Sequence, residues 1–248
     1  MASPGAMLSS LANALISVVL APTCAACDVP LETPTAGAIC SECWASIVRF
    51  IPPLCGRCGD PLPSWRLISL LESTCPRCRR RPSRISASAA LGGYEGSLRA
   101  IVHALKYGRR RTIALRLAAR MRTECAHVLD GADGLVPVPL HRTRLRQRGF
   151  NQAAELAANL GLPVLHVLRR TRPTVSQTDL PEARRHANVR DAFATTRGVD
   201  VAGLTLVLVD DVSTTGATLE ACARVLRGAG ARDVRAVTAA RVVSRRRG

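Results

Sequence analysis

Residues 206–222 read "LVLVDDVSTTGATLEAC" and are the most informative segment of the chain. It begins with four apolar residues, a run typical of a strand that is buried on both faces. Asp210 and Asp211 end this run, and a loop of hydroxyl side chains with one glycine follows them. The next residues have helical spacing. The stretch therefore predicts a strand, an acidic pair, a short loop and a helix, in that order.

The loop after the acidic pair has the chemistry of a phosphate site. Backbone N–H groups and the N-terminus of the following helix favour a dianion, and Gly216 lets the backbone approach it closely. Asp210 and Asp211 would repel a phosphate but accept hydrogen bonds from a vicinal diol, so together the features describe a ribose 5-phosphate. Taken alone, the acidic pair could instead end a strand and start a turn. The loop adds three hydroxyl donors: Thr214, Thr215 and Thr218.

Short apolar segments alternate with helical spacing through residues 85–248. This alternation predicts an α/β domain with a mostly parallel sheet. Strands are predicted at 85–94, 134–140, 163–168, 204–211 and 233–243, and helices at 96–107, 111–129, 149–161 and 217–230.

Eight of the ten cysteines form four C-x-x-C pairs before residue 80. Two such turns present four thiolates to one tetrahedral Zn²⁺, and gaps of 12 and 16 residues between successive turns suit zinc ribbons. Four thiolates leave no open position for a catalytic water, so two structural zinc sites are predicted. We assume sequential pairing of the turns, although the spacing also allows an interleaved arrangement. The predicted ligands are Cys24, Cys27, Cys40, Cys43, Cys55, Cys58, Cys75 and Cys78.

Two other uses of the cysteine pairs are disfavoured. A disulfide framework would fit an oxidised, secreted scaffold, but no secretion signal accompanies the pairs. A redox C-x-x-C would need a thioredoxin-like βαβ context, which the surrounding sequence does not show. The two isolated cysteines, Cys125 and Cys222, lie in helical patterns and are predicted to be small core residues.

Basic residues outnumber acidic ones by 35 to 18, which gives a formal net charge of +17. Such a field attracts polyanions or phosphorylated small molecules, although a solvated basic surface explains the charge equally well. Lys106 is the only lysine of the chain. It is predicted to be a cation at a helix C-terminus, with a place near the phosphate site as the alternative.

The chain is predicted to have three parts: a short amphipathic helix at 1–22, a double zinc ribbon at 23–84 and the α/β domain at 85–248. The apolar stretch "LANALISVVLAP", residues 11–22, is too short to span a bilayer and lacks the flanks of a signal peptide. We therefore expect a cytoplasmic protein without membrane insertion, with a membrane anchor as the alternative.

Residues 206–218 resemble the phosphoribosyl pyrophosphate (PRPP) signature of type I phosphoribosyltransferases. The resemblance implies that the acidic pair binds the ribose hydroxyls, that the loop holds the 5-phosphate and that Mg²⁺ enters largely with PRPP. Hypoxanthine-type enzymes carry an aspartate at the position of Thr214, so 6-oxopurine salvage is disfavoured. The implied PRPP-binding residues are Asp210, Asp211, Ser213, Thr214, Thr215, Gly216, Ala217 and Thr218.

"VPVPLH", residues 136–141, lies where this family has its pyrophosphate loop. Arg148 could close over a pyrophosphate together with Asn151 and Gln152, because a guanidinium fork suits a diphosphate. The arginines around it could instead follow a nucleic-acid backbone. The residues assigned to the pyrophosphate loop are Pro139, Leu140, His141 and Arg148.

The whole chain resembles the ComF family of competence-associated proteins. The four C-x-x-C turns, "YEGSLRAIVHALKYGRR", "VPVPLHRTRLRQRGFNQAAELA", "QTDLPEARRHANVRDAF" and "LVLVDDVSTTGATL" follow that family's order. The resemblance implies a double zinc ribbon joined to a type I phosphoribosyltransferase-like twisted parallel sheet flanked by helices. It also implies a role in DNA uptake, with PRPP, single-stranded DNA and proteins of the uptake machinery as partners. It assigns no catalytic residue.

Three classes of function fit these features. An enzyme would transfer phosphoribosyl from PRPP to an acceptor and release pyrophosphate, helped by electrostatic stabilisation of the leaving group. A non-enzymatic factor would bind single-stranded nucleic acid and keep a regulatory or vestigial PRPP site. A third possibility is an interaction scaffold built on the zinc ribbons.

Overall fold

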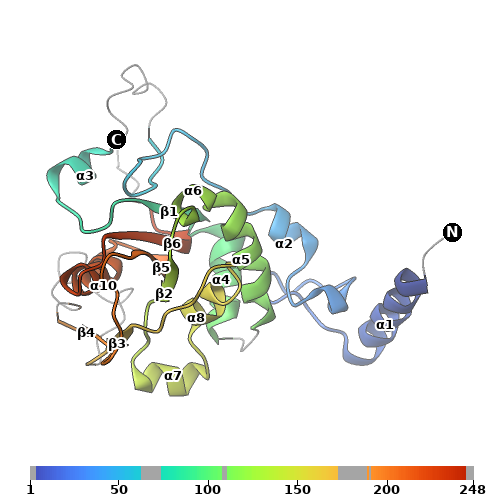
Figure 1. Cartoon of the computed structure of the whole chain (residues 1–248). Helices are drawn as coiled ribbons and strands as arrows, with labels where there is room; N and C mark the ends of the chain where they lie inside the picture. Colours follow the sequence, from blue (N-terminus) through green and yellow to red (C-terminus); the bar gives the residue numbers. More distant parts are fainter. Residues whose placement is uncertain (1–3, 63–73, 108–110, 173–188, 190, 244–248) are drawn as a thin grey trace.

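The computed structural model describes residues 4–62, 74–107, 111–172, 189 and 191–243. Its centre is a parallel sheet of four strands in the order β1-β6-β5-β2 (Figure 1). A separate antiparallel pair joins β3 to β4. The strands are β1 (Ser88–Gly93), β2 (Gly134–Pro137), β3 (Leu168–Arg170), β4 (Phe193–Thr195), β5 (Thr205–Ser213) and β6 (Asp233–Arg241).

Helices cover both faces of the sheet. The helix α10 packs on one face together with β3 and β4, and α4, α5 and α8 pack on the other. In α10, Leu219, Cys222 and Leu226 recur at helical spacing and are buried, which explains why this segment is an amphipathic helix. The helices are α4 (Gly96–Tyr107), α5 (Thr112–Glu124), α6 (Ala126–Leu129), α7 (Arg142–Arg148), α8 (Gln152–Ala157) and α10 (Ala217–Gly228).

The predicted fold class is confirmed, but several details of the prediction are wrong, among them the helix expected over 149–161, of which α8 covers only Gln152–Ala157. The helix expected over 111–129 is interrupted at Cys125, which ends α5 and precedes α6. Only Leu168 of the strand expected at 163–168 lies in a strand, because the preceding residues make just a single bridge from Val164 to Leu135. The central strand β5 continues two residues beyond the acidic pair, to Ser213, since it pairs with β6 up to Arg241.

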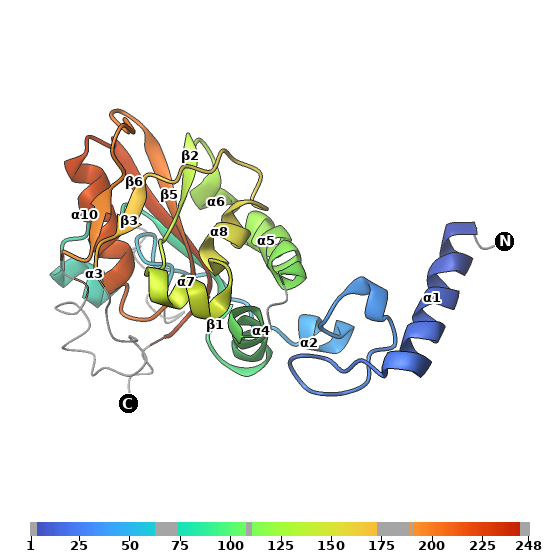
Figure 2. The ribbon, with the colours of Figure 1, turned by 90° about the horizontal axis from the view of Figure 1, so that it is seen from below.

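The N-terminal part forms two small ribbons with little regular structure. The first contains the 3₁₀ turn η1 (Pro34–Ala36) and α2 (Ser41–Ala45), and the second contains α3 (Pro76–Arg80). Ahead of them, α1 (Pro4–Leu20) stands away from the sheet (Figure 2). It contacts the first ribbon, where Ser17 Oγ donates to Leu31 O at 3.4 Å. The expected helix is present, but its exposed residues Leu15, Val18, Val19 and Leu20 do not pack on the sheet domain.

Both ribbons contact β1, the strand at one edge of the sheet. Arg49, which follows the first ribbon, forms an antiparallel bridge with Gly92. A Cβ at Gly92 would clash with the Val48 carbonyl oxygen, and a Cβ at Gly59 of the second ribbon would lie 2.6 Å from Ser88 O. The two glycines therefore permit a close approach of backbone to backbone.

Within the described part of the chain, no helix is both long and apolar enough to cross a membrane.

Candidate functional site

The acidic pair lies near the end of β5, where neighbouring side chains point to opposite faces of the sheet. Asp211 is buried and pairs with Lys106 of α4, with 3.0 Å between Oδ1 and Nζ. Asp210 lies near Arg170 of β3 and Cys222 of α10, and its Oδ1 accepts a hydrogen bond from Asp211 N at 2.9 Å. The two carboxylates therefore have separate surroundings.

Burial and the neighbouring charges change the protonation of this pair. Burial raises the pKa of Asp210 to about 7, and the charge of Asp211 adds to this increase. Burial alone would lower the pKa of Lys106, but the charge of Asp211, its hydrogen bond to Lys106 and the charge of Asp210 together outweigh burial, and the pKa is raised. Lys106 is thus a charged member of the site and not only a helix C-terminal cation.

A cavity of about 480 Å³ opens above the acidic pair. Asp210 and Asp211 line it together with Thr214 and Thr218 of the following loop. The cavity thus combines carboxylates with cations, an arrangement that suits a ligand with both hydroxyls and phosphates. Among the described residues, five basic side chains line it: Arg99, Lys106, Arg144, Arg148 and Arg170.

The loop after the acidic pair leads directly into α10. Gly216 has φ +79°, a left-handed conformation that favours glycine, and it stands at the N-cap position. Ala217 is the first helical residue, and its N–H donates to Thr215 Oγ1 at 3.4 Å. Ser213 is the last residue of β5 and is buried. The N-terminus of α10 therefore faces the loop, as a phosphate site requires.

The residues assigned to the pyrophosphate loop are divided by the structure. Leu140 and Arg148 line the large cavity. His141 instead caps α7, where its Nδ1 accepts from Thr143 N at 3.3 Å, and the half-buried Pro139 lies between β2 and this cap.

Asn151 holds the loop after β2 in place, and Gln152 orients Arg148. Asn151 Nδ2 donates to Val138 O at 3.0 Å, and Arg148 Nη1 donates to Gln152 Oε1 at 2.9 Å. Arg148 also stacks over Tyr107, with its Cζ 5.3 Å from the ring centroid. Arg148 is therefore oriented at the cavity wall by an amide and an aromatic ring.

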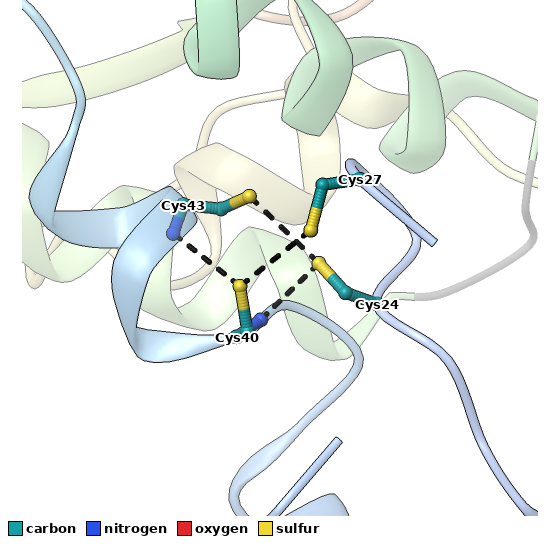
Figure 3. A group of neighbouring side chains, drawn as sticks. All are labelled: Cys24, Cys27, Cys40 and Cys43. Carbon is teal, nitrogen blue, oxygen red and sulfur yellow. Dashed lines mark hydrogen bonds between the residues drawn. The ribbon is translucent and has the colours of Figure 1, made fainter. Parts of the chain in front are cut away.

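The first four predicted zinc ligands point toward one another at the start of α2, which contains Cys43 (Figure 3). Sγ of Cys24 lies 3.9 Å from Sγ of Cys43, and Sγ of Cys27 lies 3.8 Å from Sγ of Cys40. Tetrahedral Zn–S bonds of about 2.3 Å place sulfurs roughly 3.8 Å apart, so the arrangement fits one zinc ion. Backbone N–H groups of Cys40 and Cys43 also donate to sulfurs of the group.

The other four cysteines form a second group, and all of them are buried. Sγ of Cys58 lies 3.7 Å from Sγ of Cys75, and Cys75 N donates to Cys55 Sγ at 3.2 Å. Each group contains two consecutive C-x-x-C turns, so the sequential arrangement is the one found. The protein therefore has two Cys₄ zinc-binding sites. Their full complement of sulfurs suits a structural metal.

Other predicted residues have simple structural places. Cys125 and Cys222 are fully buried, as predicted. Phe150 is buried just before α8 and carries Arg111 over its ring, and the ring of His103 lies 4.6 Å from that of Tyr107 beside the cavity. Most of the basic segment quoted as "QTDLPEARRHANVRDAF" lies outside the described residues.

The role of Lys106 in the site was predicted only as the alternative to a cation at a helix C-terminus. It lies 105 residues before Asp211 in the chain, and α4 brings it to the end of β5. One signal was present, because Lys106 is the only lysine in a chain whose other basic residues are all arginines.

Comparison with known proteins agrees with these features. Residues 15–79 match the double zinc ribbon domain family, and residues 145–247 match the phosphoribosyl transferase domain family. The fold and the cysteine groups thus define a double zinc ribbon joined to a phosphoribosyltransferase-type α/β domain.

Individual relatives cover most of the chain. DNA utilization protein YhgH of Escherichia coli (strain K12) is 33% identical over 222 residues, which cover 85% of this chain and 93% of that protein. Competence protein F of Haemophilus influenzae (strain Rd) is 29% identical over 207 residues, 79% of this chain and 87% of that protein. The chain therefore belongs to the ComF family of competence protein F-like proteins.

Solved structures match over about half of the chain. One of them, glutamine PRPP amidotransferase from B. subtilis, has 26% sequence identity and a TM-score of 0.33. The match covers 54% of this chain and 26% of that chain.

Proposed function

We propose that this protein binds PRPP with Mg²⁺ in the 480 Å³ cavity and acts in DNA uptake or processing. The observation that carries the proposal is the acidic pair at the end of β5, set between the phosphate loop and a wall of basic side chains. Asp210 and Asp211 accept hydrogen bonds from the ribose hydroxyls, and the loop at 213–218 holds the 5-phosphate. The names of the relatives, competence protein F and DNA utilization protein, support the biological role.

The basic wall suits the pyrophosphate of the ligand. Arg148 is oriented by Gln152 and Tyr107, so its guanidinium is available as a fork for a diphosphate. Mg²⁺ prefers oxygen ligands and keeps several waters, so it enters with the pyrophosphate and needs no cage of its own. The described residues offer it the carboxylates of Asp210 and Asp211, which fit as oxygen donors beside the ligand.

In an enzymatic form of this function, an acceptor attacks C1 of the ribose and the bond from C1 to pyrophosphate breaks. The basic wall would stabilise the negative charge that develops on the departing pyrophosphate. The product would be the acceptor carrying the phosphoribosyl group, and pyrophosphate would leave with Mg²⁺.

A second candidate function is single-stranded nucleic-acid binding with the PRPP site as a regulatory or vestigial feature. The formal charge of +17 favours it, because phosphate backbones bind basic surfaces. Its DNA affinity would fall steeply with salt and would survive loss of the acidic pair.

The first experiment is calorimetric titration of PRPP with Mg²⁺ into the zinc-loaded protein and into the Asp210→Ala/Asp211→Ala variant. We expect the variant to lose at least about 100-fold in affinity, because two charged acceptors are removed. Zinc content and thermal midpoint serve as controls for folding. Equal binding by both proteins would exclude the acidic pair as the ribose site.

A pH series tests the protonation of Asp210. Its folded-state pKa of about 7 lies above its ordinary value near 4, so its contribution to stability is present below about pH 4 and is lost as the pH rises to about 7. Asp210→Asn should therefore raise the thermal midpoint relative to wild type at pH 8 but not at pH 4. An equal shift at both values would contradict this account.

A further inference from the structure

A second cavity, of about 130 Å³, lies between the second zinc ribbon and the loop at 213–218. This volume is well above the roughly 15 Å³ that a single water needs. Ser213, Thr215 and Gly216 line it from the loop, whereas Thr214 and Thr218 line the larger cavity. The loop therefore borders both cavities, and the ribbon closes the smaller one.

We propose that the second zinc ribbon forms one wall of the phosphate site. The ribose and pyrophosphate of PRPP would lie in the larger cavity, and the 5-phosphate would reach past the loop into the smaller one, between the loop and the ribbon arginines. The inference rests on the function proposed above. It adds that a zinc-dependent segment distant in sequence supplies part of the ligand site.

Ser213 gives the first argument. Its side chain is only 3% exposed, and its Oγ has no hydrogen-bond partner within the part of the chain that the structure describes. A buried hydroxyl without a partner costs about 1–3 kcal/mol, so such groups need an explanation. Oγ lies 4.0 Å from the place a Cβ would take at Gly216, at the start of α10. A phosphate oxygen in the small cavity would accept this hydrogen bond.

The ribbon arginines give the second argument. Arg57 lies in the turn between Cys55 and Cys58, and its Nη1 donates to Cys78 O at 2.9 Å. Its position therefore depends on both C-x-x-C turns of the second zinc site. Arg81 directly follows α3 and lines the same cavity. Guanidinium groups offer several N–H donors and suit phosphate oxygens.

A chain of ion pairs links the ribbon to the end of the central strands. Asp60 pairs with Arg77 of the ribbon at 3.0 Å and also with Arg241 of β6. Arg241 is 5% exposed and is the register partner of Ser213 in the sheet. The position of the ribbon is therefore tied to the strand ends that carry the loop.

The charges around the small cavity nearly balance. Four arginines line it, Arg57, Arg77, Arg81 and Arg241. Against them stand the carboxylate of Glu220, that of Asp60, which pairs with Arg77 and Arg241, and a formal −2 from a filled Cys₄ site. Glu220 is held by the segment between α3 and β1, where its carboxylate accepts hydrogen bonds from Ser83 Oγ and Arg84 N. Affinity for a phosphate would then come from directed hydrogen-bond donors and not from net charge.

The test compares three ligands: PRPP with Mg²⁺, ribose 5-phosphate, and pyrophosphate with Mg²⁺. Ser213→Ala and Arg81→Gln are titrated beside wild type, with Arg80→Gln as the matched control because Arg80 is exposed and does not line the cavity. We expect both test variants to weaken PRPP and ribose 5-phosphate by about 3- to 30-fold, the loss of one or two hydrogen bonds. Pyrophosphate affinity should stay within about twofold, since this ligand has no 5-phosphate.

Ser213→Ala has a second readout that a purely structural role would not produce. Removing a buried hydroxyl without a partner should leave the thermal midpoint unchanged or raise it, while the ribose 5-phosphate affinity falls. The zinc content must stay at the wild-type value.

A zinc arm completes the experiment. Cys78→Ser at the second site should lower ribose 5-phosphate affinity by about tenfold or more, whereas Cys27→Ser at the first site should not. If Cys78→Ser does not fold, the serine and arginine variants, which keep both zinc sites, decide.

The outcomes separate the two proposals. Wild-type binding of ribose 5-phosphate and PRPP that is unaffected in Ser213→Ala and Arg81→Gln would overturn the ribbon wall and leave the PRPP function intact. Binding of ribose 5-phosphate but not PRPP would overturn the proposed function alone. No binding of either ligand by wild type would overturn both.

Discussion

The two zinc ribbons have the same ligands but are attached to the sheet domain by different forces. In the first ribbon, Cys24, Cys43 and Trp44 belong to one hydrophobic core with α4 and α5. In the second, the four cysteines form a separate cluster, and the links to the sheet domain include the pair between Asp60 and Arg241. The first ribbon is thus held by apolar burial, whereas the second depends on its metal and on polar contacts.

The largest expected difference follows removal of zinc by a chelator. Among the described residues of the second ribbon, only its cysteines and Leu62 form an apolar cluster, so amide protection in Cys55–Leu62 should fall by about a hundredfold or more. Protection in α2 should fall less, because Trp44 and Ile47 still pack on the sheet domain. Hydrogen exchange followed by mass spectrometry measures both. Equal loss of protection in the two ribbons would show that they are attached to the sheet domain in the same way.

Trp44→Ala tests the apolar attachment of the first ribbon. The indole is 2% exposed and lies beneath Arg116 and Arg120, whose Cζ atoms are 4.9 and 5.4 Å from its ring. We expect a loss of about 3–5 kcal/mol in the free energy of unfolding, measured with denaturant. PRPP affinity should remain within about twofold where the variant is folded, since the first ribbon is not part of the phosphate site. A large loss of affinity with both zinc ions retained would contradict this division of roles.

Two glycine variants, one beside each ribbon, test the difference between the ribbons with a smaller expected loss of stability. Gly92→Ala pushes β1 against Val48 beside the first ribbon, and Gly59→Ala pushes the second ribbon against Ser88. Each should cost about 1–3 kcal/mol of stability, as overpacking does. Only Gly59→Ala should also weaken ribose 5-phosphate binding, because it displaces the ribbon that borders the loop. Identical binding by the two variants would argue against the distinction.

Local sequence patterns predicted much of this molecule. The run 206–222 indicated the central strand and α10, because burial and helical spacing show up in consecutive residues. Only Val212 and Ser213, the last two residues of the strand, were expected in the loop. The C-x-x-C turns predicted both zinc groups for a similar reason, since each turn supplies two ligands to one ion.

What the sequence could not predict are the contacts between distant segments. The pair between Lys106 and Asp211 and the pair between Asp60 and Arg241 depend on how α4 and the second ribbon meet the ends of β5 and β6. The periodicity of apolar residues within one segment carries no information about contacts between segments that are distant in sequence. The interruption of the helix at Cys125 also lacked a signal, because neither glycine nor proline marks it.

The bridge between Arg49 and Gly92 covers one edge of the sheet and so protects the protein from aggregation through that edge. A parallel sheet has two edges whose unpaired N–H and C=O groups can add a strand from another molecule. Here the edge at β2 is covered by the segment around Val164, and the edge at β1 is covered by chain that connects the two ribbons. Loss of zinc would release the second ribbon, which contacts β1 at Ser88, and so uncover part of the β1 edge. We expect zinc-starved protein to aggregate by strand addition there before its sheet unfolds.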